Sequence, residues 1–220
     1  MDYLIEITQK ERMLYGENLI LLEGSIREFL SCTDMIRKYQ KETSGWDPVA
    51  SCSARIKKAD SMTEKLKRNG LAPTSYNAIH EVYDAAGVRL ICPLIEDVYL
   101  IVSLIRQIPG ITIRKEKDYI SHPKPNGYRS YHMILQFPLR FLPAGFACDV
   151  PWLEIQLRTI AMDCWASIEH QLKYKKDISN SELMQQELKR CSDEIASTDL
   201  SLSTLRELIA ASEQGKEKEV

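Results

Sequence analysis

The sequence predicts an α+β fold, in which a mixed β-sheet of about five strands is covered mainly by helices. Two observations support this prediction. Through the middle of the chain, short apolar runs of strand length alternate with stretches of helical periodicity. Near each end of the chain, a longer stretch repeats apolar residues at steps of three and four, which is typical of a long amphipathic helix. The fold class is therefore a single packed domain with helical extensions.

Four parts are expected along the 220 residues. Residues 1–45 form an N-terminal helical segment, and residues 46–178 form the central domain. Residues 179–213 form a long helix, and the charged residues 214–220 form a disordered tail. Residues 1–16 show no clear pattern.

The first helix is expected over residues 17–41. Its apolar stripe consists of Leu19, Leu22, Ile26, Phe29, Thr33 and Ile36. Ser44-Gly45 and Pro48 end the helix. The stripe is equally suited to packing on its own domain and to a contact between subunits.

The central domain begins with an extended segment over residues 53–58, in which Arg55 and Lys57 share one side. A capping-box pattern from Ser61 to Glu64 predicts a short helix that ends near Gly70. The remaining predicted elements are helices over 74–83, 95–107 and 161–174, strands over 88–92, 111–115, 131–137 and 147–158, and a connection over 141–146.

The last helix is expected to start at a second capping box, from Ser179 to Glu182. Its apolar residues keep a heptad spacing, and they are Met184, Leu188, Cys191, Ile195, Thr198, Leu202, Leu205 and Ile209. Such a seam fits another helix in the same or in a neighbouring subunit.

Composition is ordinary for a soluble globular protein, with 44% hydrophobic and 27% charged residues. The net charge of −2 means that any phosphate site depends on local clusters of Lys and Arg. The six cysteines are scattered without metal-ligand spacing, which fits a reducing cytosol. Neither a signal peptide nor a long apolar span is visible, so a cytoplasmic protein is expected.

A basic, aromatic loop runs from Lys124 to His132 and leads into a predicted strand. Pro125 fixes one φ angle, and Asn126-Gly127 favours a tight turn. The loop would present an aromatic ring for stacking beside cations that bind phosphate. Taken alone, it fits an ordinary hairpin turn with a surface tyrosine equally well.

Two carboxylates accompany this loop. Asp84 precedes one apolar strand, and Glu154 shares a strand face with Gln156 and Arg158, opposite Leu153, Ile155 and Leu157. One or two carboxylates, with substrate phosphates and waters, are the usual ligands of Mg²⁺. For an isolated carboxylate, a capped or salt-bridged surface position is the alternative.

These stretches, in this order, resemble the RelA/SpoT family. The matching pieces are Arg55-Ile56-Lys57, Asp84-x-x-Gly87-x-Arg89, Lys117-Asp118-Tyr119-Ile120, Lys124-x-Asn126-Gly127-Tyr128-Arg129-Ser130-x-His132, Glu154-x-Gln156-x-Arg158-Thr159, and the segment from Ala161 to His170. The chain is similar to the small, synthetase-only members, so residues 46–178 would be a synthetase domain with a nucleotidyltransferase-like fold.

The resemblance implies a GTP diphosphokinase that transfers the β,γ-pyrophosphate of ATP to the 3′-hydroxyl of GDP or GTP. Asp84 and Glu154 would hold Mg²⁺, and Glu154 would also orient or deprotonate the hydroxyl. The implied ATP-binding residues are Arg55, Lys57, Ser61, Arg89 and Arg129, with Arg55 and Arg89 around adenine. The implied GTP-binding residues are Lys124, Asn126, Tyr128, His132, Gln156 and Asp163.

Some assignments stay open at this point. His132 is equally well interpreted as a hydrogen-bonded core histidine, Trp165 and His170 are expected to pack, and Lys117 and Asp118 have no assigned role. Because no His-Asp dipeptide occurs, the chain is expected to synthesise the alarmone and not to degrade it.

The implied partners are ATP, GDP or GTP, and further copies of the chain in a homotetramer joined by the terminal helices. Weak binding of single-stranded RNA is a further expectation, with no DNA or membrane partner. Two other functions remain as alternatives: a toxin that transfers pyrophosphate to the 3′ end of tRNA, and an inactive copy that binds nucleotides or single-stranded RNA. The presence of Asp84 and Glu154 argues against inactivity.

Overall fold

A five-stranded mixed sheet forms the centre of the computed structural model, which describes residues 6–140, 150–174 and 181–217. The strands are β1 (Ser51–Ile56), β2 (Ala86–Cys92), β3 (Thr112–Asp118), β4 (Tyr131–Gln136) and β5 (Trp152–Thr159), in the spatial order β1-β2-β5-β4-β3. The β2–β5 pair is parallel, and the other pairs are antiparallel. The predicted α+β class and the mixed sheet are therefore confirmed.

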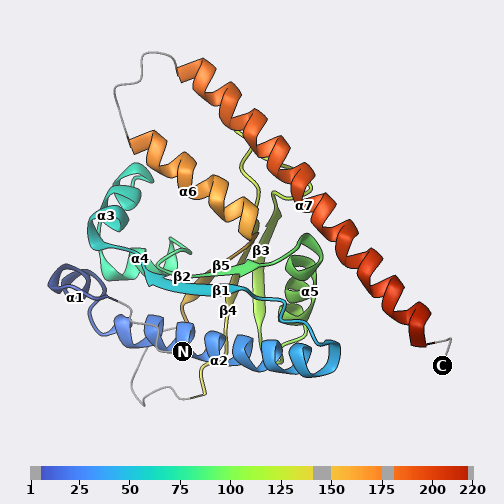
Figure 1. Ribbon diagram of the computed structural model, residues 1–220. Helices are drawn as coiled ribbons and strands as arrows, with labels where there is room; N and C mark the ends of the chain where they lie inside the picture. Colours follow the sequence, from blue (N-terminus) through green and yellow to red (C-terminus); the bar gives the residue numbers. More distant parts are fainter. Residues whose placement is uncertain (1–5, 141–149, 175–180, 218–220) are drawn as a thin grey trace.

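Helices surround this sheet (Figure 1). They are α1 (Gln9–Tyr15), α2 (Asn18–Ser44), α3 (Ala59–Arg68), α4 (Ser75–His80), α5 (Ile95–Arg106), α6 (Ile160–Tyr174) and α7 (Ser181–Glu217). In Figure 1, α2 lies on one side of the sheet, and α6 and α7 lie on the other. The connection predicted over 141–146 and the capping box at Ser179 lie outside the described residues.

The core lies between the sheet and the helices α2 and α5. On β5, Leu153, Ile155 and Leu157 are completely buried, as the alternation predicted. They pack in one apolar cluster with the buried stripe of α2. The α2 stripe is thus covered by its own domain, because Leu22, Ile26 and Phe29 have no exposed surface.

Several element boundaries differ from the sequence expectation. The α1 helix occupies a stretch without a recognisable pattern, and α4 ends at His80, earlier than predicted. The α3 helix begins at Ala59, so the capping box predicted from Ser61 is wrong. The reason is a tertiary cap, because the Glu11 carboxylate of α1 accepts a hydrogen bond from the Ala59 N–H at 2.9 Å.

The two ends of the chain also differ from expectation. The α7 helix continues to Glu217, so residues 214–217 of the predicted disordered tail are helical. Its fully buried positions are polar, whereas Leu202, Leu205 and Ile209 of the predicted seam are exposed. In the described part of the chain, no helix is long and apolar enough to span a membrane.

Candidate functional site

The strand register brings the predicted site residues into two neighbouring rows on one face of the sheet. One row runs across the five strands as Ser53, Arg89, Gln156, His132 and Lys117. The next row runs as Arg55, Gly87, Glu154, Ile134 and Lys115. Residues that are paired across strands point to the same face, so segments far apart in the chain form one surface.

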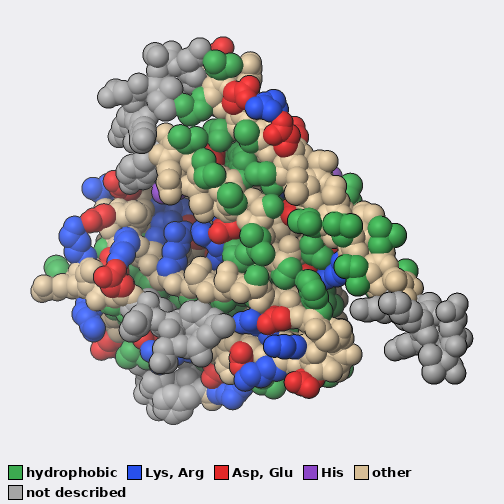
Figure 2. All heavy atoms as spheres, in the orientation of Figure 1, with side chains coloured by type: hydrophobic (Ala, Val, Ile, Leu, Met, Phe, Trp, Pro, Cys, Tyr) green, Lys and Arg blue, Asp and Glu red, His purple; other side chains and the backbone are tan. Residues whose placement is uncertain are grey.

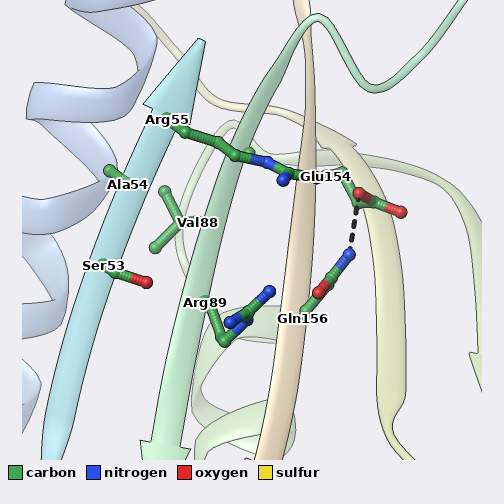
Figure 3. A pocket seen from close by; sticks show the side chains of 8 residues that line it. Ser53, Ala54, Arg55, Val88, Arg89, Glu154 and Gln156 are labelled. Atoms are coloured by element: carbon green, nitrogen blue, oxygen red, sulfur yellow. Dashed lines mark hydrogen bonds between the residues drawn. The ribbon is translucent and has the colours of Figure 1, made fainter. Parts of the chain in front are cut away.

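The half of this surface on β1, β2 and β5 contains a cavity of about 250 Å³. Arg55 extends across β2 toward Glu154, and Arg89 and Gln156 lie below it (Figure 3). Gly87 has no side chain to fill the space between Arg55 and Glu154. The first cavity is therefore flanked by two guanidinium groups and closed at one end by a carboxylate.

The half on β5, β4 and β3 contains a second cavity, of about 320 Å³. Its lining is rich in cations and aromatic rings: Lys65, Tyr83, Asp84, Lys115, Lys117, Tyr119, Lys124, His132, Ile134 and Glu154. Figure 2 shows Lys and Arg side chains gathered in a hollow of the surface beside α6. Glu154 lines both cavities, so its carboxylate stands between them.

Two neighbours hold the Glu154 side chain. Gln156 donates its side-chain N–H to Oε2 at 3.0 Å, and His132 Nδ1 lies 3.5 Å from Oε1. Burial acts to raise the pKa of Glu154, but the interactions with His132 and Gln156 outweigh it and leave the pKa lowered. The carboxylate is thus ionised at neutral pH and fixed in orientation.

Asp84 lies in the turn that enters β2, between two lysines. Its Oδ2 pairs with Lys65 at 2.6 Å and with Lys57 at 3.0 Å. Burial acts to raise its pKa, and the two ammonium groups reverse this effect and lower it. The other oxygen, Oδ1, is buried and has no hydrogen-bond partner in the part of the chain that the structure describes. An orphaned carboxylate oxygen in a cavity wall is well suited to bind a cation.

The loop from Lys124 to His132, called the central loop below, forms the predicted tight turn. Gly127 has a φ of +91° and donates its N–H to the Lys124 carbonyl at 2.8 Å. Asn126 supports the turn, because its Oδ1 accepts a hydrogen bond from the Tyr128 N–H. Asn126 therefore stabilises the loop and reaches Glu169 with its amide group.

Tyr128 is held at its hydroxyl and covered at its ring. The hydroxyl hydrogen-bonds with His132 Nε2 at 2.8 Å and accepts from Arg158 at 2.8 Å. The Lys124 ammonium lies 4.5 Å from the Tyr128 ring centre and 4.6 Å from that of Tyr119. The cation thus lies against both rings, where cation–π attraction holds it.

Asp163 at the start of α6 is paired with two arginines. Arg158 contacts its Oδ1 at 2.9 Å, and Arg89 contacts the same oxygen at 3.4 Å. The pKa of Arg89 is lowered, first by burial and then by the neighbouring Arg158 cation. The cluster of buried cations beside the first cavity is therefore only partly neutralised by this chain.

Several predicted site residues do not line the cavity expected for them. Of the predicted GTP-binding residues, Asn126, Tyr128 and Asp163 line neither cavity, and Gln156 lines the first cavity rather than the second. Of the predicted ATP-binding residues, Lys57, Ser61 and Arg129 line neither cavity, although Lys57 pairs with Asp84 in the wall of the second.

Ser61 is exposed on α3, and it lines neither cavity. Arg129 donates to the Ile120 carbonyl at 3.0 Å and pairs with Asp193 of α7 at 3.3 Å. Ser61 therefore faces solvent, and the contacts of Arg129 hold the loop and α7 together rather than lining a cavity.

The structure also locates the residues to which the sequence assigned no role in binding or catalysis. Lys117 lines the second cavity, whereas Asp118 caps the turn after β3 by accepting the N–H groups of Ile120 and Ser121. Trp165 is buried as expected. His170, also expected to pack, is exposed, because it follows the inward-facing Glu169 by one position around the helix.

Sequence reasoning missed Lys65, Tyr83 and Lys115, which line the second cavity. Lys115 could have been found from its spacing, since it shares a strand face with Lys117. Lys65 and Tyr83 carry no local signal, because folding alone brings α3 and the turn before β2 to the cavity.

The family model described as a region found in RelA / SpoT proteins matches residues 54–179. The GTP pyrophosphokinase YwaC of Bacillus subtilis is 39% identical over 149 residues, which cover 68% of this chain and 70% of that protein. The GTP pyrophosphokinase YjbM of the same organism is 30% identical over 171 residues, which cover 78% of each.

Solved structures agree with these relatives. Small alarmone synthetase 2 from Bacillus subtilis superposes with a TM-score of 0.76 at 32% identity, over 88% of this chain and 99% of that one. Small alarmone synthetase 1 from the same organism, bound to its product pppGpp, also gives 0.76, at 28% identity over 87% and 96%.

Proposed function

Since the chain belongs to the RelA/SpoT family, we propose that it is a small alarmone synthetase, a GTP pyrophosphokinase that makes ppGpp and pppGpp. The reaction transfers the β,γ-pyrophosphate of ATP to the 3′-hydroxyl of GDP or GTP. The observation that carries the proposal is the position of Glu154 between the two cavities. A carboxylate at that place stands where a donor phosphate and an acceptor hydroxyl would meet.

ATP is assigned to the first cavity. Arg55 and Arg89 lie on its two sides, and guanidinium planes stack well on a purine ring. The pKa of Arg89 is lowered by burial first, and the cations Arg158 and Arg55 also act to lower it, so Arg89 is repelled by both neighbours. A polyanionic ligand relieves this repulsion, which favours a nucleoside triphosphate over a neutral molecule.

Mg²⁺ is assigned to Asp84 and Glu154. The two carboxylates line the second cavity together, and the Asp84 charge acts to raise the pKa of Glu154, so they are close enough to interact. Among the described residues, no group of three or more His, Cys, Asp or Glu could hold a metal alone. Two carboxylates with one orphaned oxygen fit an ion that is completed by phosphates and water. When bound, Mg²⁺ would neutralise charge on the transferred phosphates.

The chain's own residues supply the remaining chemistry. Glu154 is ionised and is oriented by Gln156 and His132, so it can accept the proton of the attacking 3′-hydroxyl. Lys57 and Lys65, which pair with Asp84, lie where they can stabilise the negative charge of the pyrophosphoryl group.

The guanine nucleotide is assigned to the second cavity. Tyr128 does not line this cavity, but it contacts the lining residues Lys124 and His132 and would provide a ring for the base. Lys124, Lys117 and His132 would provide phosphate contacts. A base that stacks on Tyr128 would displace the Lys124 ammonium from the ring and free it for phosphate. Asp163 can accept the ring and exocyclic N–H groups of guanine, a pair of donors that adenine lacks.

The test is transfer of label from ATP. Purified protein is incubated with ATP labelled at the γ position, Mg²⁺ and, separately, GDP, GTP or tRNA. Label in GDP or GTP supports the proposal. Label only in tRNA, or binding of nucleotide without any transfer, would contradict it.

We further propose a homotetramer in the cytoplasm, with α7 at an interface. Apolar side chains gather over α6 and α7 (Figure 2), and Leu205 and Ile209 are 54% and 60% exposed. An uncovered row of this kind favours burial in an assembly. The α2 stripe contributes no such seam, since its own sheet covers it. Cys32, Cys92, Cys164 and Cys191 are free thiols, which fits a reducing compartment.

Light scattering tests the assembly. A tetramer gives about four times the 25.3 kDa chain mass. Leu205→Glu should give a smaller, folded species. A monomer at micromolar concentration in the unmodified protein would contradict the proposal.

A further inference from the structure

The buried face of α7 is polar. Ser192, Asp199 and Ser203 are 3%, 1% and 3% exposed, at spacings of seven and four residues that place them on one stripe. Each makes a hydrogen bond to another element. Because hydrogen bonds are directional, this stripe fixes α7 against defined atoms of the domain rather than against a smooth apolar surface.

Ser192 holds the turn of the central loop. Its hydroxyl donates to the carbonyl of Gly127, and both groups are buried. A Cβ on Gly127 would lie 2.7 Å from the Ser192 Cβ and 3.3 Å from the Lys189 Cα. The helix therefore lies directly against the turn, one residue before Tyr128. The next α7 residue, Asp193, pairs with Arg129 on the other side of Tyr128.

The same stripe holds the start of α6, which carries Asp163. Asp199 accepts a hydrogen bond of 2.6 Å from the Thr159 hydroxyl, and that hydroxyl accepts the Met162 N–H at 3.1 Å. One turn further along α6, Trp165 donates to the Leu188 carbonyl at 2.8 Å. Both residues assigned to the guanine base thus lie next to backbone that α7 holds.

We propose that α7 sets the position of the central loop, with Ser192 as a positioning residue, and thereby determines the affinity for the guanine nucleotide independently of ATP. Ser192 lines neither cavity and acts through the Gly127 carbonyl. Hydrogen bonds from α7 reach α5, α6, the end of β5 and the central loop, and these partners, all among the described residues, line neither cavity. The central loop itself begins and ends at Lys124 and His132, which line the second cavity and not the first, so α7 reaches the guanine side through this loop. That the nucleotide is GDP or GTP rests on the proposed function. The control of the central-loop position by α7 does not, because it follows from the contact between Ser192 and Gly127.

Ser192→Ala is the first variant. It leaves the buried Gly127 carbonyl without its donor, and a loss of this kind weakens binding that depends on the loop position by about five- to 150-fold. We expect the KM for GTP to rise by that factor while the KM for ATP stays within about twofold. Asp193→Asn is the second variant. It should raise the KM for GTP by a smaller factor, because the ion pair between Asp193 and Arg129 lies at the surface and is partly exposed.

Ser203→Ala is the matched control. Ser203 lies on the same helix, is equally buried and loses a bond of 2.8 Å to Glu96 of α5, but it does not touch the central loop. Both KM values should be unchanged in this variant. A rise of both KM values together in Ser192→Ala, or an equal effect of Ser203→Ala, would overturn the proposal.

Hydrogen exchange separates this proposal from the proposed function. The amides of residues 124–131 should exchange faster in Ser192→Ala than in Ser203→Ala, whether or not the protein turns over. If the amides of the central loop exchange faster in Ser192→Ala but the protein makes no alarmone, α7 does hold the loop and the proposed synthetase function is rejected. Unchanged exchange and an unchanged KM for GTP in an active enzyme would reject the coupling alone.

Discussion

Substitution of Gly87 by valine should separate the two halves of the site. Gly87 lies on β2 between Arg55 and Glu154 in one row of the sheet. It is not among the glycines with positive φ, and an added Cβ would meet its nearest neighbour, the Glu154 carbonyl oxygen, at an ordinary 3.6 Å. The strand can therefore accept valine, whose methyl groups would enter the first cavity of about 250 Å³.

The expected effects on stability and on binding are opposite in sign. Glycine inside a strand costs about 0.5–1 kcal/mol relative to alanine, so Gly87→Val should unfold at the same temperature or higher. Base stacking is worth about 1–3 kcal/mol, so blocking the space between Arg55 and Arg89 should weaken ATP binding by about five- to 150-fold. GTP binding should change little.

Separate titrations of ATP and GTP, with a thermal unfolding curve, measure these effects. Gly87→Ala is the matched control, because its single methyl group fills less of the cavity and should give an intermediate loss of ATP affinity. A well-folded Gly87→Val protein with normal ATP affinity would refute the assignment of the first cavity. An equal loss for both nucleotides would show that the two cavities are not independent.

Three further predictions concern single residues. Glu154→Gln keeps the shape of the side chain but removes its charge, so product formation should fall by about two to four orders of magnitude with the fold intact; near-normal turnover would exclude Glu154 as the base. Tyr128→Ala should weaken GTP binding by about five- to 150-fold in a titration and affect ATP much less; equal losses would make Tyr128 a structural residue. The bond from the Thr8 hydroxyl and the cap on Ala59 lower the pKa of Glu11 to about 2. Because the folded pKa lies below the ordinary value, the stabilisation is present above about pH 4.5 and is lost as the pH falls toward 2. The difference in unfolding free energy between the wild type and Glu11→Gln should shrink over that range, and a difference independent of pH would contradict this explanation.

Much of the sheet could be predicted from local pattern. Strict alternation on β5 correctly placed Leu153, Ile155 and Leu157 in the core and Glu154 with Gln156 on the other face. The turn at Asn126-Gly127 was also predictable, since few other pairs adopt its geometry. These features depend on neighbours in sequence, and such neighbours are what a pattern records.

Tertiary contacts explain what the sequence did not reveal. The true start of α3 depends on Glu11, which is 48 residues away from Ala59 in the chain. Lys65 enters the site only because α3 packs beside the turn that contains Asp84. Arg129 belongs to a motif that indicates phosphate binding, yet α7 provides a carboxylate partner for it. In each case the deciding group lies on another element, so its effect leaves no local periodicity.

The α7 helix shows most clearly why periodicity is insufficient. Its heptad pattern correctly indicated an apolar row, but the pattern left open whether that row packs within its own subunit or against a neighbouring one. In the structure, Leu202, Leu205 and Ile209 are exposed, and Ser192, Asp199 and Ser203 face the domain. A polar stripe can be buried without penalty when every member finds a partner, and here the partners are Gly127, Thr159 and Glu96. The inner face therefore holds the central loop, and the outer face leaves an exposed apolar row, which we propose is covered by another copy of the chain. One rigid helix carries both faces. Any change in KM that Leu205→Glu causes should therefore concern GTP and not ATP.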